Sequence, residues 1–460
     1  MPEIVLKNEI LHAEKGEKLS DILIKNGIFV DHPCAGKGTC KKCTVLVDGK
    51  PELSCQYTVT ADIKVTIPEK AEIISETGIT NVKSEIGNMC FALDIGTTTL
   101  ALALISLDNN EVINTVTRTN PQKMYGADVI SRIEYCRKSS HTELHRILID
   151  EINSMIASLG CEKELPLFVS GNTTMLHLFW NVDPSGIGVA PYTPVFLEKQ
   201  TVEGVEIGLK GVGRVESLPC ISAFVGADIV AGLSCVEYPE KGKYNMLIDL
   251  GTNAEIVLFT ENEVVCTSAA AGPCFEGVNI SCGMSASDGA IYAYSRSGYK
   301  TVGNVVPKGI CGTGLIDVVT ELLGCEIDET GYMENEEFEI AEGVSIAQAD
   351  VRQYQLAKSA VYSAIETLLK YKKITHNDVE KVCVSGGFSA KINLHNAVKT
   401  GLIPKDLENK CKAINNSSLL GTVRYACGTD KMKSILENSE YVDLSSTNDF
   451  SQLFIENMMF

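Results

Sequence analysis

This sequence lacks long uncharged apolar runs, an export signal and an abundance of basic residues. No apolar run approaches the roughly 20 residues that span a bilayer, and the N-terminus has neither the apolar core nor the cleavage site of a signal peptide. Lys and Arg number 40 against 59 Asp and Glu, a formal net charge of −19, whereas nucleic-acid binding needs clustered basic residues. We therefore expect a cytoplasmic protein, with no membrane and no nucleic-acid partner, that acts on proteins or small molecules.

The composition is that of a globular protein. Hydrophobic residues make up 45% of the 460 positions, which is ample for packed cores, and the length suggests about three domains. Seventeen cysteines in a long chain without an export signal are expected to be reduced thiols or metal ligands rather than disulfides. Most of them, such as Cys136, Cys235, Cys266 and Cys383, stand singly among apolar neighbours and are expected to be small core residues.

The central motif is an apolar run that reaches a carboxylate, turns on a glycine beside hydroxyls and becomes apolar again over residues 91–102. This order predicts two strands whose tight turn presents N–H and hydroxyl donors to a phosphate, with the carboxylate placed to hold a metal-bound water. The same order returns over residues 246–257, which indicates an internal repeat rather than two ordinary hairpin turns. The matching residues are Asp94, Gly96, Thr97 and Thr98 in the first copy and Asp249, Gly251, Thr252 and Asn253 in the second.

Residues 1 to about 75 are predicted to form a small α+β domain. It has a short N-terminal hairpin, a helix over 19–26 and strands at 44–47 and 63–67. Residues 69–89 then mix charges with Ser, Thr, Gly and Asn, which is typical of a linker.

A loop rich in glycine and cysteine follows the first predicted helix. Its spacing, Cys-x5-Cys-x2-Cys-x11-Cys, suits a [2Fe–2S] cluster, because the glycines let backbone N–H groups turn inward and hydrogen-bond the sulfurs. The plant-type spacing has a shorter first gap, so this loop is assigned to another ferredoxin branch. Structural zinc is the alternative, but zinc usually draws on two close cysteine pairs and only one is present. The expected cluster ligands are Cys34, Cys40, Cys43 and Cys55.

Beyond the linker the pattern is α/β. Helices are expected over 128–138, 143–159 and 348–370, and a strand at 167–175 ends in a polar turn. Asn172 and Thr173 in that turn either face a phosphate, as at the strand ends of doubly wound folds, or simply cap the next helix.

Several later stretches are rich in glycine. The loop 268–285 suggests close packing near a ligand or partner, or a tight connection. Gly312 and Gly314 lie in a turn that enters a helix, a candidate anion contact. The glycines of Ser385-Gly386-Gly387 end a strand and let a flat adenine or ribose approach the backbone, although a plain strand-to-helix turn is the alternative.

The C-terminal part gives two further expectations. The long helix carries a stripe of Arg352, Gln355 and Lys358 or Ser359, which is expected to be a solvated face. The tail over 441–460 alternates polar and apolar residues and is expected to dock as a strand and a helix.

The two Asp-x-Gly-Thr hairpins and the Ser385–Phe388 stretch resemble the two phosphate motifs and the adenosine motif of the actin, sugar kinase and Hsp70 superfamily. Joined to the N-terminal cysteine loop, this arrangement is similar to that of the reductive activators of corrinoid proteins. The similarity covers nearly the whole chain, including 270–277, 309–317 and the aromatic C-terminal end.

The resemblance implies a fold and a domain order. The fold is an α+β, β-grasp ferredoxin-like N-terminal domain followed by an α/β actin-like (ribonuclease H-like) two-lobed ATPase. The limits are 1–75 for the ferredoxin domain, 76–89 for the linker, 90–225 for lobe I and 226–460 for lobe II, with the C-terminal tail returning to lobe I. The linker passes almost directly into the first hairpin, without the additional middle domain of some longer members, so dimerisation through such a domain is left open.

The resemblance also implies an activity, in which one electron passes from the [2Fe–2S] cluster to a Co(II) corrinoid, giving Co(I), with ATP and Mg²⁺ supplying the drive. The implied partners are a corrinoid protein, expected to be a cobalamin-carrying methyl-transfer protein, and an electron donor, and a homodimer is left open. The loop 268–285 is expected to face the corrinoid protein. The expected catalytic residues are Asp94, Asp249 and Glu276, and the expected ATP-binding residues are Gly96, Thr97, Thr98, Asn172, Thr173, Gly251, Thr252, Asn253, Gly312, Gly314, Ser385, Gly386 and Gly387.

The energetics agree with such a coupling. Plant-type clusters lie near about −400 mV, and each ~59 mV by which the acceptor lies lower costs a factor of ten in a one-electron transfer. ATP can assist if lobe closure changes the coordination of the partner's cobalt. One alternative is an ATP-coupled electron donor to another low-potential enzyme, such as a radical dehydratase. A second is a nucleotide-binding iron–sulfur redox sensor. A third is a sugar kinase, and the cysteine-rich N-terminal domain argues against it.

Overall fold

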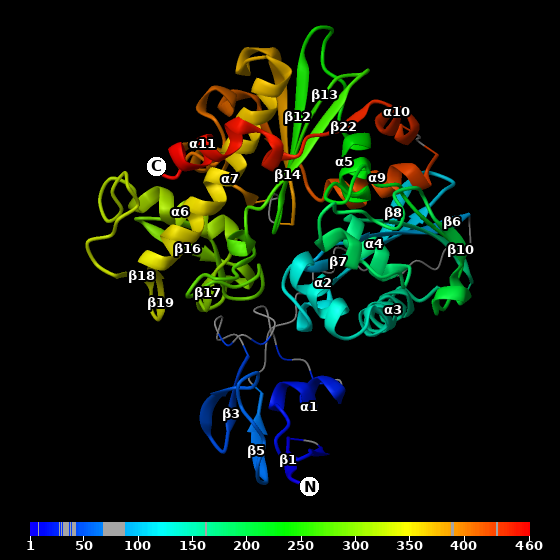
Figure 1. Cartoon of the computed structure of the whole chain (residues 1–460), viewed down its shortest axis with the longest axis vertical. Coiled ribbons are helices and arrows are strands. Elements are labelled where there is room, and N and C mark those ends of the chain that lie inside the picture. Colours follow the sequence, from blue (N-terminus) through cyan, green and yellow to red (C-terminus); the bar gives the residue numbers. More distant parts are fainter. Residues whose placement is uncertain are drawn as a thin grey trace.

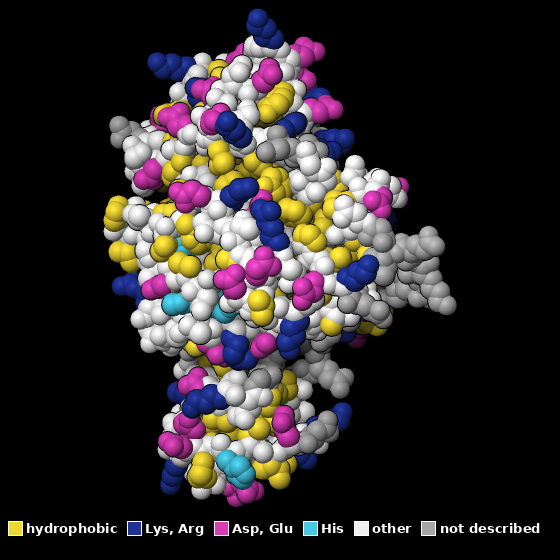
Figure 2. Space-filling model, turned by 90° about the vertical axis from the view of Figure 1, so that its right-hand side faces the viewer, with side chains coloured by type: hydrophobic (Ala, Val, Ile, Leu, Met, Phe, Trp, Pro, Cys, Tyr) yellow, Lys and Arg dark blue, Asp and Glu magenta, His cyan; other side chains and the backbone are white. Residues whose placement is uncertain are grey.

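The structure is a computed structural model that describes most of the chain. Its described residues are 1–7, 9–26, 28, 30, 36, 38, 43–67, 88–161, 163–387, 391–428 and 431–460. The predicted linker up to residue 87, the predicted ligands Cys34 and Cys40, and Phe388 lie outside them. Within the described residues, no helix is both long and apolar enough to cross a membrane. Figure 1 shows a small N-terminal unit below two larger lobes, and Figure 2 shows acidic and basic side chains interspersed over the face that it draws.

The N-terminal unit is a five-stranded sheet, in the order β2-β1-β5-β3-β4, with one helix packed on it. Leu19, Ile22 and Leu23 of the helix are buried together with Ile4 and Val45 of the sheet, and burying this apolar stripe holds the helix in place. The predicted hairpin, helix and later strands are confirmed, whereas the largely exposed edge strand β4, which contains a proline, is not one that the sequence predicted. The elements are β1 (Glu3–Val5), β2 (Ile10–His12), α1 (Leu19–Lys25), β3 (Thr44–Val47), β4 (Lys50–Leu53) and β5 (Ile63–Thr66).

The larger part of the chain contains two six-stranded sheets with the same plan. Their orders are β10-β11-β9-β6-β7-β8 and β21-β20-β12-β13-β14-β22. In each, a central strand, β6 (Met89–Ile95) or β12 (Tyr244–Leu250), pairs antiparallel with the next strand in sequence, β7 (Thr99–Ser106) or β13 (Ala254–Phe259). On its other side each central strand runs parallel to a later strand, β9 or β20. The internal repeat predicted from the hairpins is therefore confirmed as a duplicated sheet.

The remaining strands and helices complete the two lobes, and the predicted helices over 128–138, 143–159 and 348–370 are confirmed. The first lobe contains β8 (Glu111–Thr119), the 3-10 helix η1 (Pro121–Met124), α2 (Val129–Lys138), α3 (His141–Ser158), β9 (Leu165–Gly171), α4 (Thr173–Phe179), β10 (Thr201–Glu203), β11 (Val212–Ser217) and α5 (Ala227–Cys235). The following elements are β14 (Val264–Ala269), β15 (Ala290–Ser295), β16 (Gly298–Thr301), β17 (Gly309–Ile310), α6 (Gly312–Leu322), β18 (Glu337–Ala341), β19 (Val344–Ala347), α7 (Gln348–Lys372), β20 (Val379–Ser385), α8 (Leu394–Lys399), β21 (Cys411–Ala413), α9 (Ser417–Ala426), α10 (Met432–Glu437), β22 (Ser439–Tyr441) and α11 (Asn448–Glu456).

The chain passes between the lobes more than once. After the second sheet is largely built, α9 packs on β6 and β9 of the first, and α10 joins the same apolar core. The chain then returns, with β22 pairing to β14 and α11 lying along α7 (Figure 1). The predicted helix in the tail is thus confirmed, whereas the strand β22 ends at Tyr441, where the predicted tail begins. The expectation that the tail returns to lobe I is wrong, because Phe450, Phe454 and Phe460 pack on the apolar core that contains α7. The domain limits stay a prediction.

Helices α5 and α9 lie between the two sheets and touch at their backbones (Figure 1). A Cβ atom on Gly421 of α9 would collide with the backbone of Ala231 in α5, and one on Gly232 would lie 2.8 Å from the Ser417 hydroxyl. Glycine at these positions is what allows the helices to approach so closely.

The stripe on α7 that was expected to be solvated is mostly buried, so that expectation is wrong. Arg352 is exposed, but Gln355, Lys358 and Ser359 are at most 3% exposed. The C-terminal tail covers Lys358 and Ser359: Lys358 Nζ donates to the Met459 carbonyl and Ser359 Oγ to the Phe454 carbonyl. Gln355 Nε2 instead donates to the Thr330 carbonyl at 3.0 Å. The spacing of the stripe could not reveal a covering segment that lies about 100 residues further along the chain.

Replacing Gly421 by alanine tests the contact between α5 and α9. We expect Gly421→Ala to lower the free energy of unfolding by about 1–3 kcal/mol, the usual cost of forcing an atom into a packed core. Gly213→Ala is the matched control, because a Cβ there meets nothing within 4 Å. Equal stabilities of the two variants in urea denaturation of the full chain would contradict the close contact.

Lys358 should give the chain an unusual alkaline pH dependence. Burial lowers the pKa of Lys358 to about 8, so above that pH the folded chain binds fewer protons at this site than the unfolded chain does. The contribution of Lys358 to stability therefore rises between about pH 8 and about pH 10, by at most ~1.4 kcal/mol per pH unit. Lys358→Met should remove this rise, whereas Lys370→Met, at an exposed position of the same helix, should keep it. The measurement is the free energy of unfolding across that range, and identical slopes would refute the expectation.

Candidate active site

The two predicted hairpin turns lie at the ends of the two central strands. Gly96 N–H donates to the Thr99 carbonyl at 3.0 Å, and Gly251 N–H donates to the Asn253 carbonyl at 2.9 Å, so both turns are closed by the backbone. Asp94 and Asp249 stand just before these turns. The repeat therefore places two carboxylates at equivalent positions of two sheets.

The start of helix α9 links the two carboxylates. Ser418 Oγ donates to Asp94 Oδ1 at 2.7 Å, and Asn416 Nδ2 donates to Asp94 Oδ2 at 3.0 Å. Ser417 Oγ lies 2.7 Å from Ser385 Oγ, and Ser385 in turn hydrogen-bonds Asp249. Sequence reasoning missed this role. The detectable signal was an N-cap pattern, because the Asn416 side chain also accepts from the Leu419 N–H at 2.9 Å.

Two more acids, which the sequence analysis did not assign to the site, join the pair. Asp228 lies in the first turn of α5, and Glu255 lies opposite Asp249 in the β12–β13 ladder. Burial, and then the charges of Asp249 and Asp94, raise the pKa of Asp228 to about 8, while burial raises the pKa of Asp249 to about 6. Burial also raises the pKa of Asp94, and burial together with repulsion from Asp228 raises the pKa of Glu255 well above its ordinary value.

This concentration of mutually repelling carboxylates fits a divalent cation. In the described part of the chain no three His, Cys, Asp or Glu side chains are arranged to hold a metal ion directly. Mg²⁺ typically keeps several waters and binds through one or two carboxylates plus substrate phosphates, so the site suits a magnesium ion that arrives with a phosphate ligand.

Glu276 connects the two hairpin turns. Thr98 Oγ1 donates to one of its carboxylate oxygens at 2.7 Å, and Thr252 Oγ1 donates to the other at 3.0 Å. A carboxylate thus accepts from the hydroxyls that were predicted to bind phosphate. Glu276 therefore faces the hairpins, not an outward partner surface.

The other predicted residues divide into two groups. Asn172 caps α4, because its Oδ1 accepts from the Met175 N–H at 2.9 Å, and its Nδ2 donates to Thr97 Oγ1 of the first hairpin at 3.0 Å. Its contact with a phosphate stays a prediction. Thr173 instead donates to the Ser222 carbonyl at 2.7 Å. Gly312 and Gly314 are buried, and a Cβ on either would collide with neighbouring backbone, so packing accounts for them.

The adenosine motif is only partly described. Gly386 has φ +119° and lies against the Leu250 backbone, so a side chain would be strained there. Among the described residues, a Cβ on Gly387 would meet nothing within 4 Å. Ser385 is wholly buried and belongs to the link between Asp249 and α9.

Two of the four predicted cluster ligands are described. Cys43 Sγ and Cys55 Sγ lie 3.3 Å apart and are buried. Gln56 Nε2 lies 3.5 Å from Cys55 Sγ and donates to the Gly36 carbonyl at 2.6 Å, so Gln56 bridges Cys55 and Gly36. Two adjacent buried thiols fit neighbouring ligands of an iron–sulfur cluster.

Two duplicated sheets with paired aspartates at their hairpin turns define an ATPase of the actin-like class. Residues 243–460 match the family model described as the C-terminal domain of RACo, the ASKHA domain, and residues 89–241 match the RACo middle region. The chain belongs to the RACo family, the reductive activators of corrinoid proteins.

Curated and solved relatives resemble the chain over most of its length. The corrinoid activation enzyme RamQ of Eubacterium limosum is 26% identical over an alignment that is 584 positions long, covering 99% of this chain and 98% of the relative. The [Co(II) methylated amine-specific corrinoid protein] reductase of Methanosarcina barkeri is 24% identical, covering 79% and 75%. A solved structure of a reductive activator for corrinoid, iron–sulfur protein is 25% identical, with a TM-score of 0.74 and coverage of 100% and 98%.

The match to the middle region falls mostly on residues that the sequence analysis assigned to lobe I. Residues 89–241 begin at the first strand of the first hairpin, so the match adds no domain between the linker and that hairpin. The absence of an additional middle domain and a homodimer both stay predictions.

Asp228 should make magnesium binding depend on pH. Its raised pKa keeps the carboxyl protonated at neutral pH, whereas a bound cation favours the ionised form. We expect the affinity for Mg·ADP to rise between about pH 6 and about pH 8 in the wild type and to rise less in Asp228→Asn. Asp150→Asn, at an exposed position of α3, is the control. Calorimetric titration measures this, and an unchanged pH dependence in Asp228→Asn would count against the acidic site.

Without magnesium the same group should destabilise the fold as pH rises. The folded chain binds more protons at Asp228 than the unfolded chain does between the two pKa values, so this contribution to stability falls as pH rises toward about 8. Asp228→Asn should accordingly be the more stable chain at about pH 8 in the absence of Mg²⁺.

Proposed function

We propose that the chain is an ATP-dependent reductive activator of a corrinoid protein, passing one electron from a [2Fe–2S] cluster to Co(II) and giving Co(I). The observation that carries this is end-to-end likeness, because a reductive activator matches the whole chain with a TM-score of 0.74. Two relatives named for corrinoid activation and corrinoid protein reduction support the same reading.

The ATP-binding role is assigned to the hairpins and the acidic site. ATP supplies the free energy of hydrolysis and a ligand that can favour one arrangement of the lobes. Thr98 and Thr252, which now donate to Glu276, are placed to donate to phosphate oxygens instead, and the glycine N–H groups close the turns around them. Asp94 and Asp249 are assigned to magnesium or its waters. Ser418 and Asn416 at the start of α9 orient Asp94, and Ser385 at the end of β20 orients Asp249, without supplying positive charge.

The electron-carrying role is assigned to the N-terminal unit. Its sheet order, with α1 packed on one face, supports a β-grasp ferredoxin-like domain, and the buried pair Cys43 and Cys55 supports the predicted cluster site. The cluster supplies a single electron, which matches the one-electron step from Co(II) to Co(I). The glycine-rich loop and Gln56 would shield and hydrogen-bond the sulfurs, which tunes a cluster's potential. An external electron donor and a cytoplasmic location belong to the same proposal.

The loop 268–285 stays the proposed contact with the corrinoid protein, on the evidence of its exposed part. Ser281 is exposed, and both its N–H and its hydroxyl donate to Asp350 Oδ1, at 2.8 and 3.1 Å, which holds the loop to the start of α7. Ser281→Ala is therefore the informative variant for this contact. Glu276→Ala is not, because it also breaks the link between the hairpins.

The test is reconstitution of the full reaction without oxygen. The purified chain, a corrinoid protein in the Co(II) state, a low-potential reductant and Mg·ATP should together produce the Co(I) absorption, and omission of ATP should abolish it. Asp249→Asn should lose most of the ATP-dependent rate, by about 100-fold or more if it orients the metal ion. Asp150→Asn should keep it.

A matched cysteine pair separates the electron-carrying role from the ATPase. Cys43→Ser should lose the iron and the EPR signal of the reduced cluster while retaining ATP binding, whereas Cys325→Ser, at an exposed cysteine, should keep both. An iron-free wild type, or Co(I) formation that needs no nucleotide, would refute the proposal. If the chain delivers electrons in an ATP-dependent way but does not reduce the corrinoid protein, an electron donor to another low-potential enzyme is favoured.

A further inference from the structure

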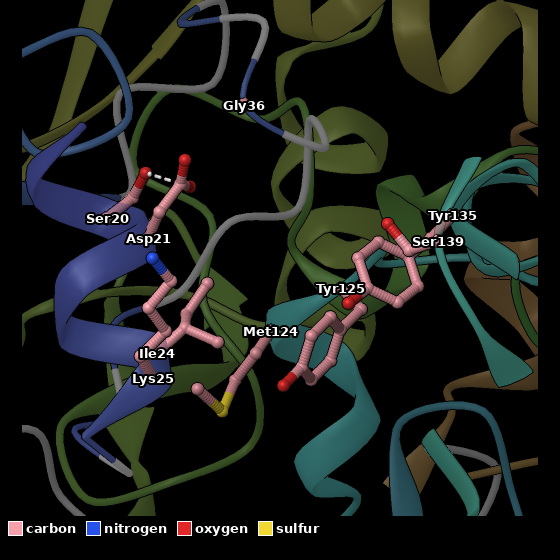
Figure 3. Close-up of a pocket in the computed structure, with 9 residues that line it drawn as sticks. All are labelled: Ser20, Asp21, Ile24, Lys25, Gly36, Met124, Tyr125, Tyr135 and Ser139. Carbon is pink, nitrogen blue, oxygen red and sulfur yellow. Dashed lines mark hydrogen bonds between the residues drawn. The ribbon is translucent and has the colours of Figure 1, made fainter. Parts of the chain in front are cut away.

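The N-terminal unit is seated on the first lobe through α1. Ile24 of α1 packs against the apolar core of that lobe. Beside this contact is a cavity of about 380 Å³ (Figure 3), which is large enough to hold several waters, so the interface is only partly packed. Among the described residues its lining includes Asp21, Lys25 and Gly36 on one side and Tyr125, Tyr135 and Ser139 on the other.

The lobe presents a fixed aromatic platform at this interface. The rings of Tyr125 and Tyr135 have centroids 4.6 Å apart, and Tyr125 Oη donates to Glu143 at 3.2 Å. Gly36, on the N-terminal side, belongs to the loop that carries the predicted cluster ligands. The seated position therefore brings Gly36 next to lobe I.

The same segment of lobe I holds the first phosphate hairpin. Asn120 Nδ2 donates to the Gly96 carbonyl and Asn120 N–H to the Thr98 carbonyl, both at 2.8 Å. Asn120 Oδ1 accepts from Gln122 N–H at 3.0 Å, which links these hydrogen bonds to η1. Asn120 and Gln122 are wholly buried.

Arg132 on α2 completes this grip. Its side chain is wholly buried, and it donates to the Thr97 carbonyl of the hairpin, to the Gly126 carbonyl at 3.0 Å and to Gln122 Oε1 at 3.2 Å. No ion pair to a carboxylate is formed by Arg132 among the described residues. Burial lowers the pKa of Arg132 to about 10, and the negative charge that opposes this most is that of Glu276, on the far side of the turn.

We propose that residues 120–139 couple the nucleotide site to the seated position of the cluster-bearing unit, with Arg132 as the positioning residue. The inference rests on the proposed function for the identity of the nucleotide. When Thr98 exchanges the Glu276 carboxylate for a phosphate, the hairpin turn changes its charge and its contacts. Asn120 and Arg132 hydrogen-bond to that turn, and Tyr125 and Tyr135 lie on the same segment. A change in the turn therefore shifts the two tyrosine rings that lie against α1. Nucleotide binding then sets whether the electron carrier stays against lobe I or leaves it.

Hydrogen exchange of the full chain tests the coupling without relying on activity. At saturating Mg·ADP or Mg·adenylyl imidodiphosphate, with occupancy checked by equilibrium dialysis, we expect the exchange rate of peptides over Leu19–Lys25 to change several-fold in the wild type. In Arg132→Gln, at equal occupancy, this change should be largely lost. Arg137→Gln removes an exposed arginine from the same helix and should respond as the wild type does.

A second variant keeps the test decisive if Arg132→Gln does not fold. Coupling between sites is reciprocal, so Tyr135→Ala, which weakens the platform far from the phosphates, should change the Kd for Mg·ADP by about fivefold or more. Tyr299→Ala, at an exposed tyrosine of β16, should leave it unchanged. Three results would each overturn this inference alone. They are nucleotide binding with no change in exchange rate over Leu19–Lys25, a wild-type change in folded Arg132→Gln, and an unchanged Kd in Tyr135→Ala. Absence of nucleotide binding would overturn the proposed function as well.

Discussion

The contact between the backbones of α5 and α9 is the constraint on which the rest of the structure depends. Because Gly232 and Gly421 leave no side chain between the helices, the first turn of α9 reaches the ends of both central strands. From there Ser418 holds Asp94, and Ser417 reaches Asp249 through Ser385. Larger residues at these two positions would push the helices and the two sheets apart, and the two hairpins would no longer be linked through α9.

Over the residues that the structure describes, the acidic site lacks a positive charge to balance its carboxylates. The acids receive hydrogen bonds from neutral hydroxyl and amide groups, which orient them but supply no positive charge. The buried guanidinium of Arg132 is held behind the hairpin, on carbonyl oxygens, and does not neutralise them. Such a site is best suited to a ligand that carries both a divalent cation and a negative charge. The cation balances the carboxylates, and the negative group accepts hydrogen bonds from the hairpin turns.

The sequence predicted the parts of the fold that local pattern encodes. Hairpins with Asp-x-Gly-Thr, the long helix over 348–370 and the helix of the tail all follow from periodicity and turn chemistry, and the structure contains them. Asp228 and Glu255 were missed because each lies in an ordinary helix or strand, and only the folded sheets bring them near Asp249. The buried stripe at Lys358 was misjudged for the same reason, since its cover comes from distant residues.

The hydrogen bond between Asp94 and Ser418 joins residues that are 324 positions apart. During synthesis, the first hairpin leaves the ribosome long before the helix that orients its carboxylate has been translated. The acidic site must therefore be among the last features of the chain to assemble, after both sheets exist. A nascent chain halted anywhere before that helix would carry all the turn chemistry of the first hairpin and still lack an oriented aspartate.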